Sequence, residues 1–253
     1  MYNPISTYRL QFSKDFTFKE LKPLIGYLHN FGIKTIYASP ILQATSESEH
    51  GYDVVNPFKI HADIGNEKHF LKLHQKLQDK TMGWLQDIVP NHMAYSVENP
   101  WVFDMLEKGI TSIYADYFDV DWNYNRNTDL IGKISLPSFG DDIEFLIKNE
   151  ELFIGYNEKS GLHLKYYENE FPVNIETYHE VLKNINYYSS NLKKSVEKAI
   201  NPVDRADFYK RFDHLKNTWL AIYIKDKEFK VQLSGALAEI NDDEEALSSI
   251  IFN

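Results

Sequence analysis

Cysteine does not occur in this 253-residue sequence. Its absence excludes disulfide bonds, thiolate metal sites and cysteine nucleophiles together. The sequence also has no apolar run near the ~20 residues that a membrane-spanning helix needs. Its first residues show no basic segment followed by an apolar core, the pattern of a secretory signal. We therefore expect a cytoplasmic protein with no membrane partner.

Positive charge is scarce. The chain has 27 Lys and Arg residues against 37 Asp and Glu residues, a formal net charge of −10. Proteins that neutralise phosphates need clustered Lys and Arg, so we expect no nucleic-acid partner. Hydrophobic residues make up 43% and charged residues 25%, which is typical of a folded globular chain and excludes intrinsic disorder. The 17 Tyr, 16 Phe and 4 Trp residues provide many flat faces, several with a polar edge, which suit sugar binding.

Strands and helices alternate through the first ninety residues. Residues 5–12, 33–42 and 82–89 are rich in apolar and β-branched types and predict three strands. Residues 66–80 are amphipathic and predict a helix, and another helix is expected to begin after Thr17. This order is typical of a parallel sheet with helical crossovers.

The first predicted helix has clear start and stop signals. Thr17 and Glu20 have the spacing of a capping box, and Gly32 stands where a left-handed helix terminator is expected. Apolar residues recur between them at helical intervals and predict one buried face. These residues are Phe18, Leu21, Leu24, Ile25 and Leu28.

In parallel sheets, ligands bind in the loops that follow the strands. Two such loops stand out here, residues 39–63 and the segment that begins at Pro90. The pattern of predicted elements changes beyond residue 92. Residues 99–122 predict a short helix, residues 130–175 predict short strands between turns, and the chain from residue 176 is helical in pattern.

The acidic run at residues 241–245 is expected to be a solvated helix start or a loop rather than a binding tail.

The run from Asp87 to His92 ends the third predicted strand. Asp87 closes a buried strand, Pro90 stops the backbone ladder, and Asn91 and His92 follow. Strand alternation and the turn at Pro90 allow these polar side chains to project over the strand ends. Two interpretations fit the spacing: a functional site, or a strand-terminating turn whose Asp and Asn satisfy nearby backbone groups.

A second polar run, from Glu49 to Asp53, lies in the loop after the second predicted strand. Gly51 permits a positive φ or a close backbone approach. His50, Tyr52 and Asp53 offer a donor, a ring face and an acceptor, which is what a pyranose ring needs from a protein. The alternative is an ordinary loop glycine beside a core tyrosine.

Together, in this order and placement, these runs resemble the α-amylase family of glycoside hydrolases. Surrounding stretches resemble the trehalose-forming branch of that family, the maltooligosyltrehalose synthases. The resemblance is dense from residue 5 to about residue 178 and faint afterwards. It is carried by residues 6–11, 38–42, 50–55, 87–93, 114–122 and 136–140.

The resemblance implies an α/β fold, the N-terminal part of a (β/α)8 TIM barrel containing its first three βα units. A large α+β insertion would follow the third strand. Residues 1–92 would then hold three barrel strands and two helices, and residues 93–253 an inserted subdomain of short strands followed by helices.

The resemblance also implies a reaction, the intramolecular conversion of the terminal α-1,4 linkage of a maltooligosaccharide to an α,α-1,1 linkage. Tyr52 would stack on the glucose at the cleavage subsite, with Asp53 in the same substrate-binding loop. His50 and His92 would hydrogen-bond its hydroxyl groups, Asp87 would order the site, and Asn91 would hold the loop. We expect Tyr52, Asp87 and His92 to converge on one face. No cofactor is implied, and although the Asn91 position helps to bind calcium in some relatives, nothing here requires a metal.

The catalytic carboxylates of the family are not found in this sequence. Retaining glycosidases need a nucleophile and an acid/base, which in this family follow the first motif on the fourth and fifth strands. No Gly-x-Arg-x-Asp run occurs after residue 93; the nearest run, residues 203–207, is in a charged helical context. We therefore expect both carboxylates to lie C-terminal to Asn253 and the isolated chain to be inactive.

Several alternatives stay open. The chain could be a non-catalytic module that holds α-glucan, or part of an α-amylase-type hydrolase. It could also be another parallel-barrel enzyme in which an acidic pair within residues 116–142, a region that includes Asp116, Asp119 and Asp121, binds a divalent ion. Three strands cannot close a barrel, so an open sheet edge would have to be covered by a later segment or by a second copy of the chain.

Overall fold

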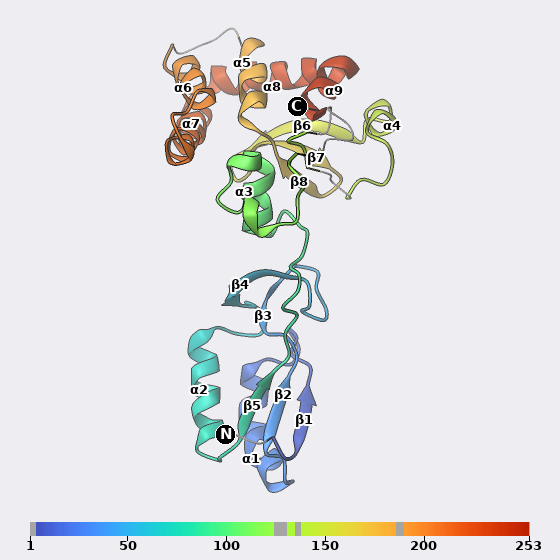
Figure 1. The fold of residues 1–253 in the computed structure, drawn as a ribbon, viewed down its shortest axis with the longest axis vertical. Helices are drawn as coiled ribbons and strands as arrows, with labels where there is room; N and C mark the ends of the chain where they lie inside the picture. Colours follow the sequence, from blue (N-terminus) through green and yellow to red (C-terminus); the bar gives the residue numbers. More distant parts are fainter. Residues whose placement is uncertain (1–3, 124–130, 135–137, 186–189, 253) are drawn as a thin grey trace. The chain divides into compact units, whose positions relative to one another are not determined.

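The computed structural model describes residues 4–123, 131–134, 138–185 and 190–252. Leu136 and Pro137, within one of the stretches that carry the family resemblance, lie outside these residues. The chain divides into two compact units, Met1–Pro100 and Trp101–Asn253, each of which is described by itself (Figure 1). Among the described residues, no helix is both long enough and apolar enough to cross a lipid bilayer.

The first unit is built on a parallel three-stranded sheet. Its strands are β1 (Thr7–Leu10), β2 (Thr35–Ala38) and β5 (Gly83–Gln86), with β2 in the centre. Ile36 of β2 lies opposite Tyr8 of β1 and Trp84 of β5. The three predicted strands and their parallel arrangement are confirmed, although each strand is shorter than its apolar run because the ladder covers only four residues.

Helices α1 (Phe18–Asn30) and α2 (Glu67–Gln78) are the two crossovers of this sheet. They pack together and share one core with the central strand β2 (Figure 1). This core is closely packed because each helix contributes an apolar stripe, and Ile36 fills the space between them. The fully buried members include Leu21, Ile25, Ile36, Leu73 and Leu77.

The predicted boundaries of α1 are confirmed. Thr17 and Glu20 form the capping box, and Gly32 has a φ of +96°, which favours glycine at the end of the helix. One predicted core residue was wrong: Leu24 is 41% exposed. A helical turn of 3.6 residues places Leu24 at the edge of the stripe formed by Leu21, Ile25 and Leu28, so its side chain points outward.

The predicted loop 39–63 is not wholly irregular. It contains an antiparallel hairpin of β3 (Leu42–Ala44) and β4 (Val54–Ile60), whose register shifts twice. Sequence alternation is weak in β3 because it is only three residues long, and its pairing depends on partners that lie 10 to 18 residues away, from Ala44–Val54 to Leu42–Ile60. The hairpin matters for function because it carries the polar run of residues 49–53 at its tip.

The second unit contains an antiparallel sheet. The predicted short strands are β6 (Leu152–Asn157), β7 (Gly161–Tyr166) and β8 (Asn169–Pro172), paired in chain order. The predicted short helix is α3 (Pro100–Lys108), followed by two single 3-10 turns, η1 (Gly109–Thr111) and η2 (Ala115–Tyr117). A further short helix, α4 (Ile143–Lys148), precedes the sheet.

Helices fill the C-terminal part of the second unit, as its pattern predicts. They are α5 (Ile175–Lys183), α6 (Ser190–Ile200), α7 (Arg205–Lys225), α8 (Lys227–Asp242) and α9 (Glu244–Phe252). Trp219 of α7 is fully buried and contacts Tyr178 of α5 and Phe229 of α8 edge to face. Such aromatic pairs lock neighbouring helices at defined angles, so Trp219 is the centre of this helical layer.

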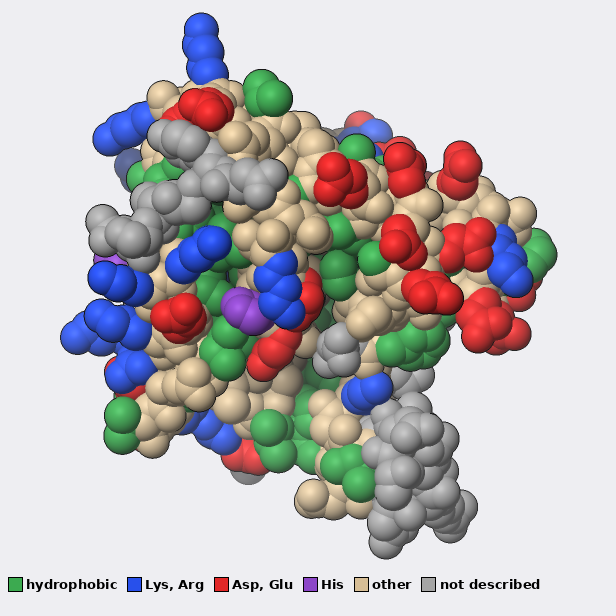
Figure 2. All heavy atoms as spheres, turned by 90° about the horizontal axis from the view of Figure 1, so that it is seen from above, with side chains coloured by type: hydrophobic (Ala, Val, Ile, Leu, Met, Phe, Trp, Pro, Cys, Tyr) green, Lys and Arg blue, Asp and Glu red, His purple; other side chains and the backbone are tan. Residues whose placement is uncertain are grey.

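Many charged side chains of the second unit lie at its surface. On the face drawn in Figure 2, Lys and Arg side chains gather towards one side and Asp and Glu side chains towards the other. The acidic run at residues 241–245 contributes four exposed carboxylates at the junction of α8 and α9. This face therefore carries mixed charge, unlike the continuous basic surface of many nucleic-acid-binding proteins.

Asn241 is the exception within that acidic run. Its side-chain amide donates to the carbonyl oxygen of Ile154 at 3.0 Å, and its amide oxygen accepts from the Ile154 N–H at 2.8 Å. β6 is an edge strand, and Ile154 would otherwise present two unpaired backbone groups. The side chain of Asn241 thus pairs one edge of the sheet to α8, a contact that the expectation of a solvated loop did not include.

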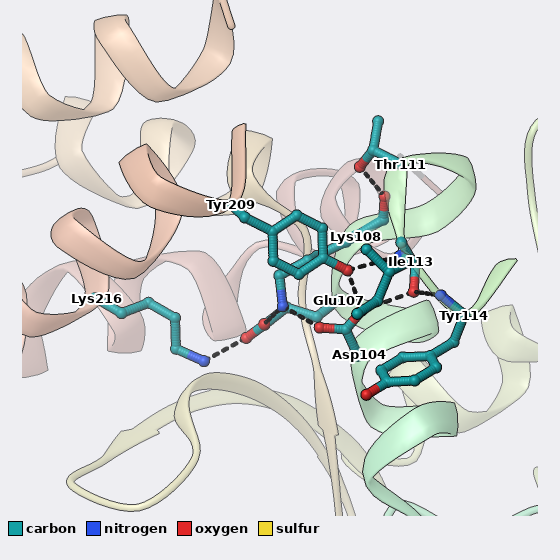
Figure 3. Close-up of polar contacts among 9 residues, drawn as sticks. Asp104, Glu107, Lys108, Thr111, Ile113, Tyr114, Tyr209 and Lys216 are labelled. Atoms are coloured by element: carbon teal, nitrogen blue, oxygen red, sulfur yellow. Dashed lines mark hydrogen bonds and ion pairs between the residues drawn. The ribbon is translucent and has the colours of Figure 1, made fainter. Parts of the chain in front are cut away.

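Buried charges join α3 to α7 (Figure 3). Lys108 has only 6% of its side chain exposed and makes ion pairs with Asp104 and with Glu107, the latter at 3.0 Å. Glu107 also pairs with Lys216 of α7, and Asp104 accepts hydrogen bonds from Tyr209 and Ser112. Burial acts to lower the pKa of Lys108, but the charges and hydrogen bonds of Glu107 and Asp104 outweigh it and hold that pKa above its ordinary value.

Removing Glu107 is expected to destabilise the second unit. Glu107→Ala leaves the ammonium groups of Lys108 and Lys216 without their shared partner, and breaking a buried charge network in this way costs about 3–5 kcal/mol. Glu239→Ala removes an exposed carboxylate from α8 and is the matched control. Urea unfolding followed by circular dichroism measures both. Equal midpoints for the two variants would contradict a stabilising role for this network.

Candidate functional site at the carboxyl ends of the parallel strands

Three polar side chains of the first unit meet where the parallel strands end. Arg9 lies on β1, Asp87 directly follows β5, and Tyr52 stands just before β4 at the tip of the hairpin. Because parallel strands run in one direction, their carboxyl ends share one edge of the sheet, and side chains far apart in sequence meet there. The predicted convergence of Tyr52 with Asp87 follows from this topology.

The contact between Tyr52 and Asp87 is direct. The Tyr52 hydroxyl donates to Asp87 Oδ2 at 2.7 Å, and an Arg9 guanidinium nitrogen lies 3.4 Å from that hydroxyl and 3.7 Å from the same carboxylate oxygen. The hydrogen bond to Asp87 raises the pKa of the Tyr52 hydroxyl, because the bond stabilises the protonated phenol. The hydrogen bond to Tyr52 in turn raises the pKa of Arg9.

Arg9 was not among the residues predicted from the sequence. Its guanidinium lies 5.6 Å from the ring centroid of Tyr37, its neighbour on β2, and donates to the side chain of Gln11 at 3.1 Å. The sequence does place Arg9 near the end of the first predicted strand, as it places Asp87 near the end of the third. The sequence alone does not fix the strand order that brings the two together.

His50 supports the backbone of the hairpin tip. Its Nδ1 accepts the backbone N–H of Tyr52 at 3.1 Å, and its ring centroid lies 5.7 Å from that of Tyr52, with the planes inclined by 30°. With Nδ1 acting as an acceptor, the neutral imidazole carries its proton on Nε2. The side chain is 60% exposed, so this N–H can reach a ligand beside the Tyr52 ring.

Asp53 is engaged within its own loop. Its Oδ2 accepts the hydroxyl of Thr45 at 2.5 Å, and its Oδ1 accepts the hydroxyl of Ser48. Partial burial acts to raise the pKa of Asp53, but these hydrogen bonds outweigh it and hold the pKa below its ordinary value. With both oxygens occupied, the arrangement favours a loop-ordering role over the sugar contact that we expected.

Asn91 and His92 lie at the surface and contact each other. The Asn91 amide oxygen is 3.2 Å from His92 Nδ1. Across the residues that the structure describes, no hydrogen bond or ion pair joins His92 to Tyr52 or Asp87. The structure therefore brings together Tyr52, Asp87, Arg9 and His50, and leaves His92 paired with Asn91.

Two further contacts hold the loops around this group. The Glu98 carboxylate accepts the backbone N–H of Ser46 at 3.0 Å and its hydroxyl at 3.0 Å, which links the segment after β5 to the hairpin. The Gln86 amide donates to the carbonyl oxygen of Ser39 at 2.9 Å, which links β5 to the end of β2. Neither was predicted, because each depends on a contact across roughly fifty residues of chain.

The other acidic residues considered from the sequence do not form a second candidate site among the described residues. In the run 203–207, Asp204 caps α7 and Asp207 pairs with Arg211, so this run starts a helix and is not a strand-end nucleophile. Within the described part of the chain, no group of three or more His, Asp or Glu side chains is arranged to hold a metal ion. The alternative of a metal site in residues 116–142 gains no support from the described residues of that range.

A sequence model of the alpha-amylase catalytic domain matches residues 21–209, which include the hairpin, Asp87 and most of the second unit. The chain belongs to the alpha-amylase family. The predicted family resemblance is therefore confirmed, and with it the fold class: β1, β2 and β5 with α1 and α2 are the beginning of a parallel barrel that these strands alone do not close.

Within the alpha-amylase family, the chain is similar to proteins named maltooligosyl trehalose synthase or glycosyltrehalose synthase. A protein of Mycobacterium tuberculosis named a putative maltooligosyl trehalose synthase is 37% identical over 145 residues, which cover 54% of this chain and 18% of the relative. A solved glycosyltrehalose synthase is 31% identical with a TM-score of 0.61, covering 82% of this chain and 25% of that chain.

A solved maltooligosyltrehalose synthase from Arthrobacter ramosus is 37% identical with a TM-score of 0.58, covering 68% of this chain and 21% of that chain. The chain thus spans about a fifth of the length of the curated relative described above.

The depressed pKa of Asp53 predicts that the hairpin tip loosens in acid. Ionised Asp53 stabilises the folded loop at pH values above the unfolded pKa of about 3.9, and this stabilisation is lost as the pH falls through the lower folded pKa. Amide hydrogen exchange at Gly51 and Tyr52, corrected for intrinsic rates, should rise roughly three- to tenfold in that window, the effect of losing hydrogen bonds of about 1 kcal/mol.

In Asp53→Asn the same amides should exchange faster already at pH 7 and gain little more in acid. Asp15→Asn, at an exposed carboxylate, is the control and should behave as the unmodified chain. An identical pH dependence in the Asp53 variant and the unmodified chain would show that Asp53 does not order the hairpin.

Proposed function

We propose that this chain forms the front part of an α-glucan-rearranging barrel of the maltooligosyltrehalose synthase type. The reaction is the conversion of the terminal α-1,4 linkage of a maltooligosaccharide to an α,α-1,1 linkage by intramolecular transglycosylation. Support comes from the alpha-amylase family membership and from the 31–37% identity to relatives that carry that name. The setting is the cytoplasm, with maltooligosaccharide or α-glucan as the partner.

The observation that carries this proposal is the bond between Tyr52 and Asp87. A phenol whose hydroxyl is tied to a carboxylate at 2.7 Å has a fixed ring plane. One face of a glucose ring is apolar, and a preoriented aromatic ring can stack on it without a further loss of side-chain freedom. Tyr52 therefore forms the wall of the glucose subsite, and Asp87 and Arg9 hold it in place.

Hydrogen bonds complete the subsite around the stacked glucose. The Nε2–H of His50 donates to a sugar hydroxyl beside the Tyr52 ring. His92 reaches a second hydroxyl once a ligand is bound, and Asn91 steadies it through the contact at 3.2 Å. Asp53 acts one step away by fixing the loop that carries both His50 and Tyr52.

The bond-breaking groups come from elsewhere in the barrel. Retaining chemistry needs two carboxyl groups about 5–5.5 Å apart, one as nucleophile and one as acid/base. Asp87 is held by Tyr52 and Arg9 and serves as a positioning residue. The nucleophilic Asp and the acid/base Glu belong to the fourth and fifth strands, C-terminal to Asn253. Residues 93–253 then form a subdomain inserted between the third and fourth strands.

The same proposal accounts for the two open edges of the parallel sheet. β1 and β5 are both edge strands of the parallel sheet, and each presents backbone groups along one side. In a complete barrel, later strands pair with both edges. In the isolated chain, we expect these edges to pair with the edges of a second copy instead.

A second candidate function is non-catalytic α-glucan binding. It is supported by the engagement of the Asp87 carboxylate with Tyr52 and Arg9, since a carboxylate held in this way orders a site without attacking a substrate. The two candidates share one glucose subsite and differ in whether bonds are rearranged.

The 253-residue chain is expected to give no trehalose-ended product from maltopentaose, because the catalytic pair is supplied by later strands. The measurement is mass spectrometry combined with enzymatic detection of non-reducing product after prolonged incubation. A related full-length maltooligosyltrehalose synthase, assayed in parallel, is the positive control. Product formed by the purified chain would refute the assignment of the catalytic carboxylates to sequence beyond Asn253.

Weak maltopentaose binding at the Tyr52 subsite is also expected, above the micromolar range because part of the subsite wall is missing. Titration followed by the imidazole NMR signals of His50 measures this site locally. Tyr52→Ala should weaken the response about tenfold, the effect of losing about 1.4 kcal/mol of ring stacking. Tyr52→Phe retains the ring and should lose less. An unchanged titration in Tyr52→Ala, or tight micromolar binding by the unmodified chain, would count against this subsite.

A further inference from the structure

Three aromatic rings of the second unit form a cluster that the glucose subsite does not use. Trp101 lies at the start of α3, Tyr114 precedes η2, and Tyr117 ends it. The rings of Trp101 and Tyr114 are nearly parallel, inclined by 8° with centroids 5.4 Å apart. The Tyr117 ring lies 5.7 Å from that of Trp101 and 6.1 Å from that of Tyr114, inclined to them by 52° and 60°.

The cluster is open to solvent on the Tyr117 side. Tyr117 is 71% exposed, an unusual exposure for an aromatic residue that already contacts two other rings. Trp101 and Tyr114 are half-buried, and the carboxylates of Asp116 and Asp119 on either side of Tyr117 are exposed. The surface thus combines apolar ring faces with phenol hydroxyls and acceptor oxygens.

The backbone beneath the rings is fixed to α3. Ser112 is fully buried; its hydroxyl accepts the N–H of Tyr114 at 3.0 Å and donates to Asp104 at 2.6 Å. Figure 3 shows Tyr114 attached to this network, which continues to Lys108 and Tyr209. Ala115, the residue after Tyr114, is also buried. The rings therefore stand on a rigid base, which lowers the entropic cost of binding a ligand.

We propose that Trp101, Tyr114 and Tyr117 form a second α-glucan-binding surface that shares no residue with the Tyr52 subsite. This inference rests on the proposed function, because it takes the ligand class from it. Adjacent glucose rings of an α-1,4-linked chain are turned relative to each other, so the chain curves. Two ring planes that meet at 52–60° can each stack on one of two successive glucose units, whereas a flat β-1,4 ribbon meets only one plane.

The surface binds glucose units that do not react. It requires at least two linked residues, and it therefore favours longer maltooligosaccharides over maltose or glucose. Asp116 and Asp119 accept hydrogen bonds from hydroxyl groups at the rims of the stacked sugars. Ile110 and Ile113, which are 53% and 49% exposed, extend the apolar part of this region. A protein docked on the apolar residues is the rival occupant, and the experiment separates the two.

The experiment uses the full chain carrying Tyr52→Ala, so that binding at the first subsite is suppressed, and maltohexaose as the probe in isothermal titration calorimetry. Adding Tyr117→Ala should weaken the remaining affinity about tenfold, which corresponds to about 1.4 kcal/mol. Tyr117→Trp keeps a ring face and should retain the affinity. Tyr27→Ala is the matched control, since Tyr27 is 66% exposed and stacks on Phe31 in the first unit, and no inclined third ring lies beside it among the described residues.

Each outcome has a distinct meaning. If the unmodified chain binds no maltohexaose, both the proposed function and this inference fall. If Tyr52→Ala weakens binding and Tyr117→Ala does not, the second surface is wrong and the proposed function stands. If Tyr117→Ala weakens binding in a chain whose Tyr52→Ala variant is unaffected, the second surface stands and the first subsite fails.

Selectivity and self-association give two further readouts. Cellohexaose should bind the Tyr52→Ala chain at least several-fold more weakly than maltohexaose, and equal binding would contradict the argument from inclined ring planes. Sedimentation of the Tyr117→Ala chain should match that of the unmodified chain. A change in sedimentation without a change in maltohexaose affinity would identify this patch as a protein contact and overturn the glucan proposal.

Discussion

The hydrogen bond from Tyr52 to Asp87 is the contact on which the candidate site depends. It joins the tip of an irregular hairpin to the residue that follows the edge strand β5, with Arg9 completing the group from β1 at the other edge of the sheet. Without it, the hairpin would be held near the strand ends mainly by the Glu98–Ser46 contacts. This anchor orients the Tyr52 ring, while His50 and Asp53 order the hairpin tip through contacts within the loop itself.

In the second unit, a network of buried charges has the same anchoring role. Asp104, Glu107 and Lys108 belong to α3, and Glu107 pairs with Lys216 of α7. The carboxylate of Asp104 also accepts from Ser112 and so fixes the backbone that carries the aromatic cluster. A buried charge network is costly to assemble, and it stabilises one arrangement of its elements because alternative arrangements would leave charges unpaired. The network thus determines where the exposed rings stand.

Local signals in the sequence predicted the elements of this fold well. The capping box of Thr17 and Glu20, the terminator Gly32 and the apolar run around Ile36 each act within a few residues, so their outcome could be predicted before any tertiary contact was known. The meeting of Tyr52 and Asp87 was also predictable, because parallel strands place their ends together. The exposed Leu24, the hairpin within residues 39–63, and the contributions of Arg9, Glu98 and Asn241 were not. The exposure of Leu24 reflects its place at the edge of the apolar stripe of α1. The others depend on register or on a partner distant in sequence, and hydrophobic periodicity contains no information on either.

The amide of Asn241 has a consequence for the β6 edge of the antiparallel sheet. By satisfying both backbone groups of Ile154, one side chain does what an additional strand would do for that margin of the sheet. At that position a foreign strand could add to β6 only after displacing Asn241, so this side chain protects one point of the edge from strand addition. The second unit thereby limits unwanted pairing with other chains at Ile154 without a further strand of its own.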